Sequence, residues 1–376
     1  MRILYVNDAL AISGGLERIL IEKINLLADM YGYEMYIVTT NQGRHPLPYP
    51  LSRKVVFHDL GIQFHQQHQF RGLKRLLKRW QLIRLFRKRL CEHILSVQPD
   101  VIVSVRAEML GAILKAKGRI PLLFESHGIR FAKMFDGSNS FHKLLSTYYN
   151  RRVKYADMVV ALSEGDAADW RSLNSRVCVI PNVVHLSEDN YSQCQNKSVI
   201  FIGRFSYQKD IGSLIRIWEI VYSRHPDWQL NIYGGYGDDY DNSQDMIRQK
   251  NINIIVHAPT SDIFRKYCES SILVLTSRYE PFGLVLPEAM SCGLPVVAFD
   301  CPFGPAEIVT DGYDGFLIAK SDIEAFADKV CLLIENNSLR LTMGQAGIRS
   351  SRRYGAQHIM PRWKQLFEQL VAERKT

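Results

Sequence analysis

Hydrophobic and polar residues form a repeating pattern along the chain, in which short runs rich in Val, Ile and Leu are each followed by a longer stretch with helical spacing. Near-continuous apolar runs of this kind are typical of parallel strands buried on both faces of a sheet. In the first half they predict strands at 2–7, 35–40, 55–60, 100–105, 121–127 and 157–163. In the second half they predict strands at 198–204, 229–235, 252–258, 272–277 and 295–300.

The two series of strands are separated by a polar segment without periodicity, "PNVVHLSEDNYSQCQNKS". This arrangement predicts two doubly wound, Rossmann-like α/β domains that face each other across a cleft, with ligands bound beyond the carboxyl ends of the strands. We expect an N-terminal domain over 1–182, a linker over 183–197 and a C-terminal domain over 198–355. The remaining segment, 356–376, predicts a terminal helix that can return to the N-terminal domain.

The composition is that of a globular protein with sizeable cores, with 47% hydrophobic and 23% charged residues. Seven scattered cysteines without a C-x-x-C pair indicate neither a disulfide framework nor a zinc site. The start, "MRILYVN", reads as a first strand rather than a signal peptide, and no apolar run is long enough to span a membrane. We therefore expect a cytoplasmic protein.

Positive charge is concentrated in the first half, where residues 1–190 hold 27 Lys and Arg against 17 Asp and Glu, a net charge of +10. Residues 191–376 hold 20 against 21, a net charge of −1. The segment 71–90 alone carries nine Lys and Arg, with an apolar stripe that includes Leu73 and Trp80. This basic amphipathic helix either lies on an anionic membrane, which would place the protein on the inner face of the membrane, or buries its stripe in the domain core.

Several loops that follow predicted strands carry residues suited to binding an anion. Gly14 and Gly15 precede a helix, so their backbone amides can hold phosphate, although taken alone they are better explained by a tight turn without ligand. Arg204 and Lys209 follow the first strand of the second domain, where two cations can neutralise a diphosphate or simply be solvated. His127 ends a strand and can contact a ligand or be structural. No motif with metal-ligand spacing is present, so we expect no metal cofactor.

The apolar stretch 277–299, "SRYEPFGLVLPEAMSCGLPVVAF", carries two carboxylates, Glu280 and Glu288. A helix that begins near Gly283 and ends at Gly293 places Glu280 on the preceding loop and Glu288 more than one turn into the helix. Carboxylates beside an anion site accept hydrogen bonds from hydroxyl groups rather than bind the anion itself. The pattern therefore predicts a nucleotide sugar as ligand. The amides that would bind its diphosphate belong to Gly283, Leu284 and Val285.

The combination of motifs resembles the glycosyltransferases of family 4, which have the GT-B architecture. The two glutamates occur as E-x-x-x-x-x-x-x-E, and the motifs extend over most of the chain, more densely in its second half. They are "SGGLER", "SHG", "VIPN", "GRFSYQK", "YEPFGLVLPEAMSCGLPV" and "GPAEIVTDGYDG". Three positions depart from the family pattern: Asp210 and Val183 stand where Gly is usual, and Pro287 precedes the second glutamate.

This resemblance implies a role for each candidate residue. Glu288 would hold the ribose hydroxyls, Glu280 would contact the donor sugar, and His127 would lie near the transferred sugar. Arg204 and Lys209 would stabilise the leaving diphosphate. Backbone groups of Gly14, Gly15, Gly283, Leu284 and Val285 would approach the phosphates.

The activity implied by the resemblance is retaining transfer of a hexose or N-acetylhexosamine from a nucleotide sugar, most often UDP-linked, to a glycan or lipid-linked glycan acceptor. The product would be an α-glycoside in the synthesis of cell-surface polysaccharide or glycolipid, with no metal required. The alternative is a nucleotide-sugar epimerase or hydrolase of the same fold, which needs no acceptor. The acidic balance of the second half disfavours a nucleic-acid partner. The absence of a G-x-G-x-x-G motif disfavours a dinucleotide oxidoreductase.

Overall fold

The computed structural model describes residues 1–11, 14–130, 140–187 and 190–375. The chain divides into two compact units. The first comprises Met1–Val183 together with Ile359–Thr376, and the second comprises Val184–His358. Each unit has its own sheet and its own hydrophobic core, so the prediction of two doubly wound α/β domains is confirmed.

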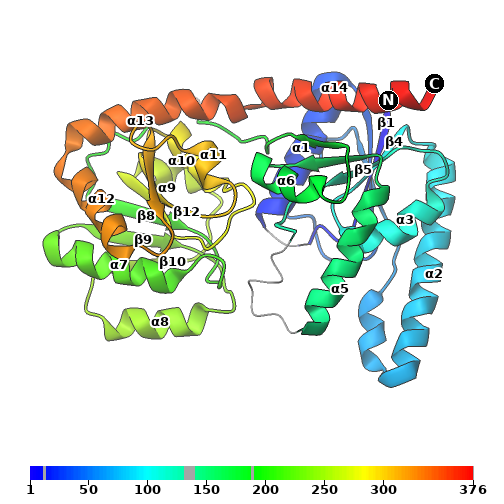
Figure 1. Ribbon diagram of the computed structural model, residues 1–376, viewed down its shortest axis with the longest axis horizontal. Helices are drawn as coiled ribbons and strands as arrows, with labels where there is room; N and C mark the ends of the chain where they lie inside the picture. Colours follow the sequence, from blue (N-terminus) through cyan, green and yellow to red (C-terminus); the bar gives the residue numbers. More distant parts are fainter. Residues whose placement is uncertain (12–13, 131–139, 188–189, 376) are drawn as a thin grey trace. The chain divides into compact units, whose positions relative to one another are not determined.

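The first unit contains, within the described residues, a parallel seven-stranded sheet with the order β3-β2-β1-β4-β5-β6-β7 (Figure 1). The chain builds outward from β1 through β2 to β3 and then restarts with β4 on the other side of β1, so the switch point lies between β1 and β4. The strands are β1 (Arg2–Asn7), β2 (Glu34–Thr39), β3 (Val55–Asp59), β4 (Val101–Ser104), β5 (Leu122–Glu125), β6 (Met158–Ala161) and β7 (Val177–Val179).

Alternate residues of these strands face two layers of helices. Leu4, Val6 and Phe124 point to a core formed with α2, α3 and α6. Tyr5 points to the opposite face, where α1 lies beside α14, as Figure 1 shows. The helices are α1 (Gly15–Tyr31), α2 (Gly72–Val97), α3 (Leu110–Ala116), α5 (Ser140–Asn150), α6 (Glu164–Arg171) and α14 (Ala356–Lys375), with 3-10 turns η1 (Phe64–Gln69), η2 (Ala107–Met109) and η3 (Arg151–Tyr155).

The second unit contains, within the described residues, a parallel six-stranded sheet with the order β10-β9-β8-β11-β12-β13. Its switch point lies between β8 and β11. The strands are β8 (Ser198–Ile202), β9 (Gln229–Tyr233), β10 (Ile254–His257), β11 (Ile272–Leu275), β12 (Val296–Asp300) and β13 (Gly315–Ala319). The helices are α7 (Ile211–Arg224), α8 (Tyr240–Gln249), α9 (Ile263–Cys268), α10 (Val285–Ser291), α11 (Pro305–Ile308), α12 (Ile323–Glu335) and α13 (Asn337–Ser351), followed by the turn η4 (Arg352–Tyr354).

Every strand predicted from the sequence forms, and most end one or two residues earlier than predicted, where the chain turns into the following loop. Two strands were missed. β7 has only three residues at the edge of its sheet, and all three are half-buried, so the sequence shows no buried run there. β13 follows directly on the turn "DGYDG", and its Phe316 and Ile318 pack into the core of the second unit.

Candidate functional site

The two loops at the switch point of the second sheet carry half of the predicted site residues. One loop, 203–210, follows β8, and the other, 276–284, follows the neighbouring strand β11. The amide of Arg278 donates to the carbonyl of Gln208 at 2.8 Å, and Nε2 of Gln208 donates to the carbonyl of Tyr279 at 3.1 Å. The hydroxyl of Thr276 also donates to the carbonyl of Lys209 at 3.0 Å. The loops are therefore fixed to each other by hydrogen bonds across the switch point.

Lys209 and Glu280 form an ion pair between these loops. Oε1 of Glu280 accepts from Nζ of Lys209, from the hydroxyl of Ser277 at 3.0 Å and from Nε2 of Gln208 at 3.4 Å. Glu280 is only 5% exposed, and its amide and carbonyl pair with Pro302 and Phe303 in the loop after β12. Within the described residues, Oε2 of Glu280 has no hydrogen bond, so one carboxylate oxygen is held in place while the other remains open.

Glycines allow the backbone of the loop 203–210 to pack closely against the Lys209 side chain and against the loop after β9. A Cβ atom at Gly203 would lie 3.1 Å from Cδ and Cε of Lys209, so the lysine side chain passes directly over this glycine. A Cβ atom at Gly234, after β9, would lie 2.2 Å from the carbonyl oxygen of Gly203. Arg204 lies beside this contact with an exposed side chain, and it forms no hydrogen bond or ion pair with the residues that the structure describes.

Asp210 ends the same loop in the left-handed conformation, with φ +50°. This conformation accounts for the Gly of the family pattern, since a side chain at positive φ is strained and Asp tolerates it better than most residues. The carboxylate also caps α7 by accepting from the amide and hydroxyl of Ser213 at 3.4 and 2.9 Å. Nη2 of Arg278 donates to Oδ1 of Asp210 at 2.9 Å. The departure at Asp210 therefore preserves the turn that presents Lys209.

Glu288 lies in α10, which begins at Val285 rather than near Gly283. The expectation that Glu288 sits more than a turn into the helix is therefore wrong, because it belongs to the first turn. It is 3% exposed, and the hydroxyl of Tyr267 in α9 donates to its Oε2 at 3.0 Å. Pro287 lies in the same turn, where its missing amide removes no helical hydrogen bond.

The residues that precede α10 form a turn at Gly283, whose φ of +92° favours glycine. Its carbonyl accepts from the amide of Leu286 at 2.9 Å and so closes the turn. The amides predicted to meet a diphosphate make no hydrogen bond among the residues that the structure describes. They belong to Gly283, Leu284 and Val285.

The other predicted residues, Gly14, Gly15 and His127, belong to the first unit. Gly14 is the N-cap of α1 and Gly15 its first residue, and the carbonyl of Gly14 accepts from the amide of Arg18 at 3.1 Å. His127 follows β5, and its Nε2 lies 2.9 Å from Oε1 of Glu125. The structure thus gives His127 a carboxylate partner, which the sequence pattern did not reveal.

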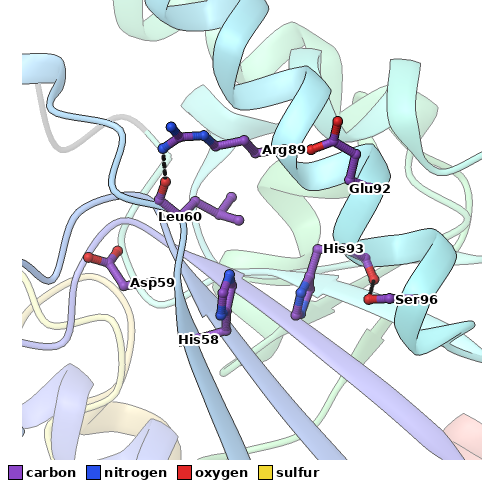
Figure 2. A pocket seen from close by; sticks show the side chains of 7 residues that line it. All are labelled: His58, Asp59, Leu60, Arg89, Glu92, His93 and Ser96. Atoms are coloured by element: carbon purple, nitrogen blue, oxygen red, sulfur yellow. Dashed lines mark hydrogen bonds between the residues drawn. The ribbon is translucent and has the colours of Figure 1, made fainter.

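A surface cavity of about 470 Å³ between β3 and α2 contains none of the predicted site residues. Figure 2 shows the rings of His58 and His93 facing each other in this cavity, and their centroids are 4.9 Å apart with planes inclined by 7°. Stacked rings do not direct their nitrogens to one point, so this pair is not arranged to hold a metal ion. Among the described residues, no group of His, Cys, Asp and Glu is arranged to hold one.

Comparison with known families identifies the protein family of this chain. Residues 13–188 match the model described as Glycosyltransferase Family 4, and residues 187–350 match the model described as Glycosyl transferases group 1. Together the two matches extend from residue 13 to residue 350. The chain belongs to glycosyltransferase family 4. This family-4 enzyme is 28% identical to the amylovoran biosynthesis glycosyltransferase AmsD of Erwinia amylovora, over 97% of this chain and 99% of the relative.

Solved structures share the fold of this family-4 enzyme. Sucrose-phosphate synthase from Thermosynechococcus elongatus has a TM-score of 0.82 at 16% identity, over 99% of this chain and all of the other. A single-residue mutant of S. aureus TarM, in complex with fondaparinux, alpha-GlcNAc-glycerol and UDP, has a TM-score of 0.79 at 17% identity, over 97% and 99% of the two chains. The expected GT-B fold is therefore confirmed.

Sequence reasoning missed several partners of the site residues. Tyr267 gives no signal because its hydroxyl reaches Glu288 from a separate helix. Gln208 and Ser277 are sequence neighbours of predicted residues, but only the three-dimensional turn directs their side chains to Glu280. Lys23 does leave a signal, because it interrupts the apolar stripe "ILIEKINLLA" and so indicates a buried partner.

Proposed function

We propose that this family-4 glycosyltransferase is a retaining enzyme that transfers a hexose or N-acetylhexosamine from a UDP-sugar to a glycan or lipid-linked glycan acceptor. The product is an α-glycoside in the synthesis of a cell-surface polysaccharide or glycolipid. Its relatives support this proposal, since AmsD acts in amylovoran biosynthesis and the TarM complex contains UDP and an α-linked GlcNAc.

The observation that carries the proposal is that the carboxylate of Glu280 is hydrogen-bonded through only one of its oxygens within the described residues. Three donors hold Oε1, whereas Oε2 has no hydrogen bond among the described residues. This open oxygen can accept a further hydrogen bond, and a hydroxyl of the donor sugar supplies one. Oε2 of Glu288 accepts a hydrogen bond from the hydroxyl of Tyr267, and we assign Glu288 to the ribose hydroxyls.

Two cations meet the charge of the leaving diphosphate in this proposal. The ammonium of Lys209 has three N–H donors, so its bond to Glu280 orients it and leaves others for phosphate oxygens. Arg204 supplies a guanidinium without another partner in the described part of the chain. The amides of Gly283, Leu284 and Val285 add backbone donors, and Gly14, Gly15 and His127 complete the set of residues that we assign to the donor.

In the proposed reaction, the bond between the anomeric carbon and the diphosphate oxygen breaks as the acceptor hydroxyl adds on the same face of the sugar. The acceptor proton passes to the leaving diphosphate, so no further reactant is needed. Negative charge grows on the diphosphate, where preformed cations act most strongly on the rate. We therefore propose that transfer does not depend on a divalent metal ion.

The acceptor is proposed to be reached at an anionic membrane surface through the first half of α2. The sequence left open whether the apolar stripe of this helix is buried, and the structure buries only its later part, which includes Leu90. The earlier residues Leu73, Leu76, Leu77 and Trp80 are 73%, 63%, 55% and 59% exposed. Figure 1 shows this half of α2, with η1 beside it, extending beyond the sheet of the first unit.

Charge supports an anionic lipid surface as the partner of this stripe. Nine Lys and Arg lie within 71–90, and each contributes about 1 kcal/mol of attraction near such a surface. No helix in the described part of the chain is long and apolar enough to cross a membrane. We propose peripheral attachment on the cytoplasmic face, where nucleotide sugars are supplied.

The experiment that tests the function measures nucleotide release from a set of UDP- and GDP-sugars, with and without lipid extract and with and without EDTA. We expect release from one donor that depends on the extract and not on the metal. The anomeric configuration of the product is then determined by NMR. Nucleotide release without any acceptor would indicate the alternative hydrolase, and isomerisation of the donor without release would indicate the alternative epimerase. A β-linked product would contradict retention.

A further inference from the structure

Three polar side chains of the first unit form a continuous chain beneath the loop that carries His127. Lys23 of α1 forms an ion pair with Oε1 of Glu125 at the end of β5, and the same oxygen lies 2.9 Å from Nε2 of His127. The side chains of Lys23 and Glu125 are 2% and 1% exposed, and that of His127 is 7% exposed. The glycosyltransferase family assignment does not explain why an ion pair is buried here.

Aromatic rings cover the lysine end of this chain. Nζ of Lys23 lies 4.2 Å from the ring centroid of Trp363 and 5.2 Å from that of Tyr5. Rings in these positions attract a cation through their negative faces while they exclude water. The ion pair is therefore formed by α1 and β5 and covered by β1 and α14.

Glu125 is ionised in this environment. Burial alone would raise its pKa, but the charge of Lys23 and the hydrogen bonds from Lys23 and His127 hold the pKa of Glu125 below its ordinary value. A buried ion pair contributes little net stability, because desolvation of both ions opposes their attraction. The ion pair lies beside a candidate catalytic histidine, which suggests that it sets the tautomer of that histidine.

An ionised carboxylate only accepts hydrogen bonds, so the hydrogen between Glu125 and His127 must reside on Nε2 of the imidazole. The other ring nitrogen, Nδ1, has no hydrogen bond among the described residues. Lys23 matters here because its positive charge already balances the carboxylate.

We propose that Lys23 and Glu125 are positioning residues that hold His127 as a neutral imidazole with hydrogen on Nε2, so that Nδ1 accepts a hydrogen bond from a hydroxyl of the bound sugar. This proposal rests on the function proposed above for the identity of the ligand. The tautomer itself is a property of the protein alone. It can therefore be tested separately from sugar transfer.

Two double variants isolate the hydrogen bond from the buried charges. Lys23→Met/Glu125→Gln and Lys23→Met/Glu125→Leu both remove the ion pair. Only the glutamine variant retains a carbonyl oxygen that accepts from Nε2–H. We expect the glutamine variant to keep its kcat within about threefold. The leucine variant should lose about 10²-fold in kcat with little change in the KM for the donor, because a displaced catalytic group loses the aligned geometry.

The independent readout is the ring state of His127, measured by two-bond ¹⁵N–¹H correlation on histidine-labelled wild-type protein, with His127→Gln to assign its signals. We expect the Nε2–H tautomer in the wild type and the glutamine variant, and a tautomer mixture in the leucine variant. An Nδ1–H or doubly protonated ring in the wild type at about pH 7.5, well above the ordinary pKa of imidazole, would overturn the proposal, even where the leucine variant does not fold.

The two proposals fail in different ways. If the wild type transfers no sugar from any donor while His127 shows the Nε2–H tautomer, the proposed function is wrong and the positioning role of Lys23 and Glu125 stands. If the wild type is active and the folded leucine variant loses the tautomer but keeps its kcat, the positioning role is wrong and the proposed function stands.

Discussion

The hydroxyl of Tyr267 donates a hydrogen bond of 3.0 Å to Oε2 of Glu288, and both side chains are buried. Tyr267 belongs to α9 and Glu288 to the first turn of α10, so the bond joins two short helices on one side of the second sheet. Neither helix is long enough to be stable alone. The position of the carboxylate therefore depends on this contact between helices.

Tyr267→Phe should weaken donor binding more than it slows transfer. The variant removes one donor from a buried carboxylate, which costs about 1–3 kcal/mol and loosens Glu288 before the ribose binds. We expect the KM for the nucleotide sugar to rise about tenfold with a smaller change in kcat, as measured by initial rates. Tyr222→Phe is the matched control, because its hydroxyl has no hydrogen bond among the described residues. Equal effects of both variants would contradict the role of the Tyr267 hydroxyl.

Arg204→Ala and Lys209→Ala should each lower kcat by about 10²–10³-fold, because each removes one donor at the charge that develops on the diphosphate. Single-donor turnover with purified protein measures the loss, and circular dichroism confirms that the fold survives. Arg248→Ala, which removes an exposed ion pair on α8, serves as the control. Near-normal turnover in either site variant would refute its assignment.

Asp210→Ala should destabilise the second unit far more than Asp210→Gly. Both substitutions remove the side-chain cap of α7, but only glycine adopts a φ of +50° without strain. We expect a loss of about 2 kcal/mol for alanine, from the cap and the left-handed conformation together, and less than about 1 kcal/mol for glycine. Urea unfolding measures the difference. Equal losses would show that the backbone conformation at Asp210 carries no strain.

Asp166 should make the stability of the first unit depend on pH. Its side chain is 2% exposed in α6, and Oδ1 makes no hydrogen bond with the described residues. Burial raises the pKa of this carboxyl to about 7, although Ser126 and Trp170 oppose the shift. Because the pKa of the unfolded carboxyl is near 3.8, the native state binds the extra proton between these values, and stability falls as pH rises through that window.

Asp166→Asn should remove this dependence. We expect the variant to be more stable than the wild type by about 2–4 kcal/mol at pH 8 and by less at pH 5, as measured by urea unfolding. Asp245→Asn on the surface of α8 should change neither value. A gain of the same size at both pH values would mean that Asp166 is ionised in the native state throughout.

The first half of α2 should bind vesicles that contain anionic lipid. Trp80→Glu and Leu76→Glu place charge on the exposed stripe and should reduce flotation with such vesicles about tenfold, because each loses apolar burial and adds repulsion. Leu95→Glu, at an exposed position near the other end of α2, is the matched control. Wild-type protein that fails to float at low salt would contradict the membrane proposal.

Much of the fold was predictable because parallel strands buried on both faces leave unambiguous apolar runs. The sequence located the ends of β8 and β11 to within two residues, and the loops that follow them carry Arg204, Lys209 and Glu280. Placing these residues at the site requires only that each follows a strand directly in the sequence, because the loops after parallel strands lie at the same edge of the sheet.

Contacts between separate elements were not predictable. The ion pair of Lys209 with Glu280 joins residues 71 positions apart, and that of Lys23 with Glu125 joins residues 102 apart. Their formation depends on loop geometry and helix packing, for which no spacing rule exists. The start of α10 was also misplaced, because Gly283 forms a left-handed turn that the periodicity of the helix does not distinguish from a first turn.

The last helix also determines when the first unit can mature on the ribosome. Trp363 and Phe367 are almost fully enclosed, yet they join a unit whose other residues end at Val183. The whole second unit must therefore be synthesised before the face of α1 that carries Lys23 receives its cover. Until then, nascent chains expose an apolar surface, which makes this half of the protein a natural client of chaperones during translation.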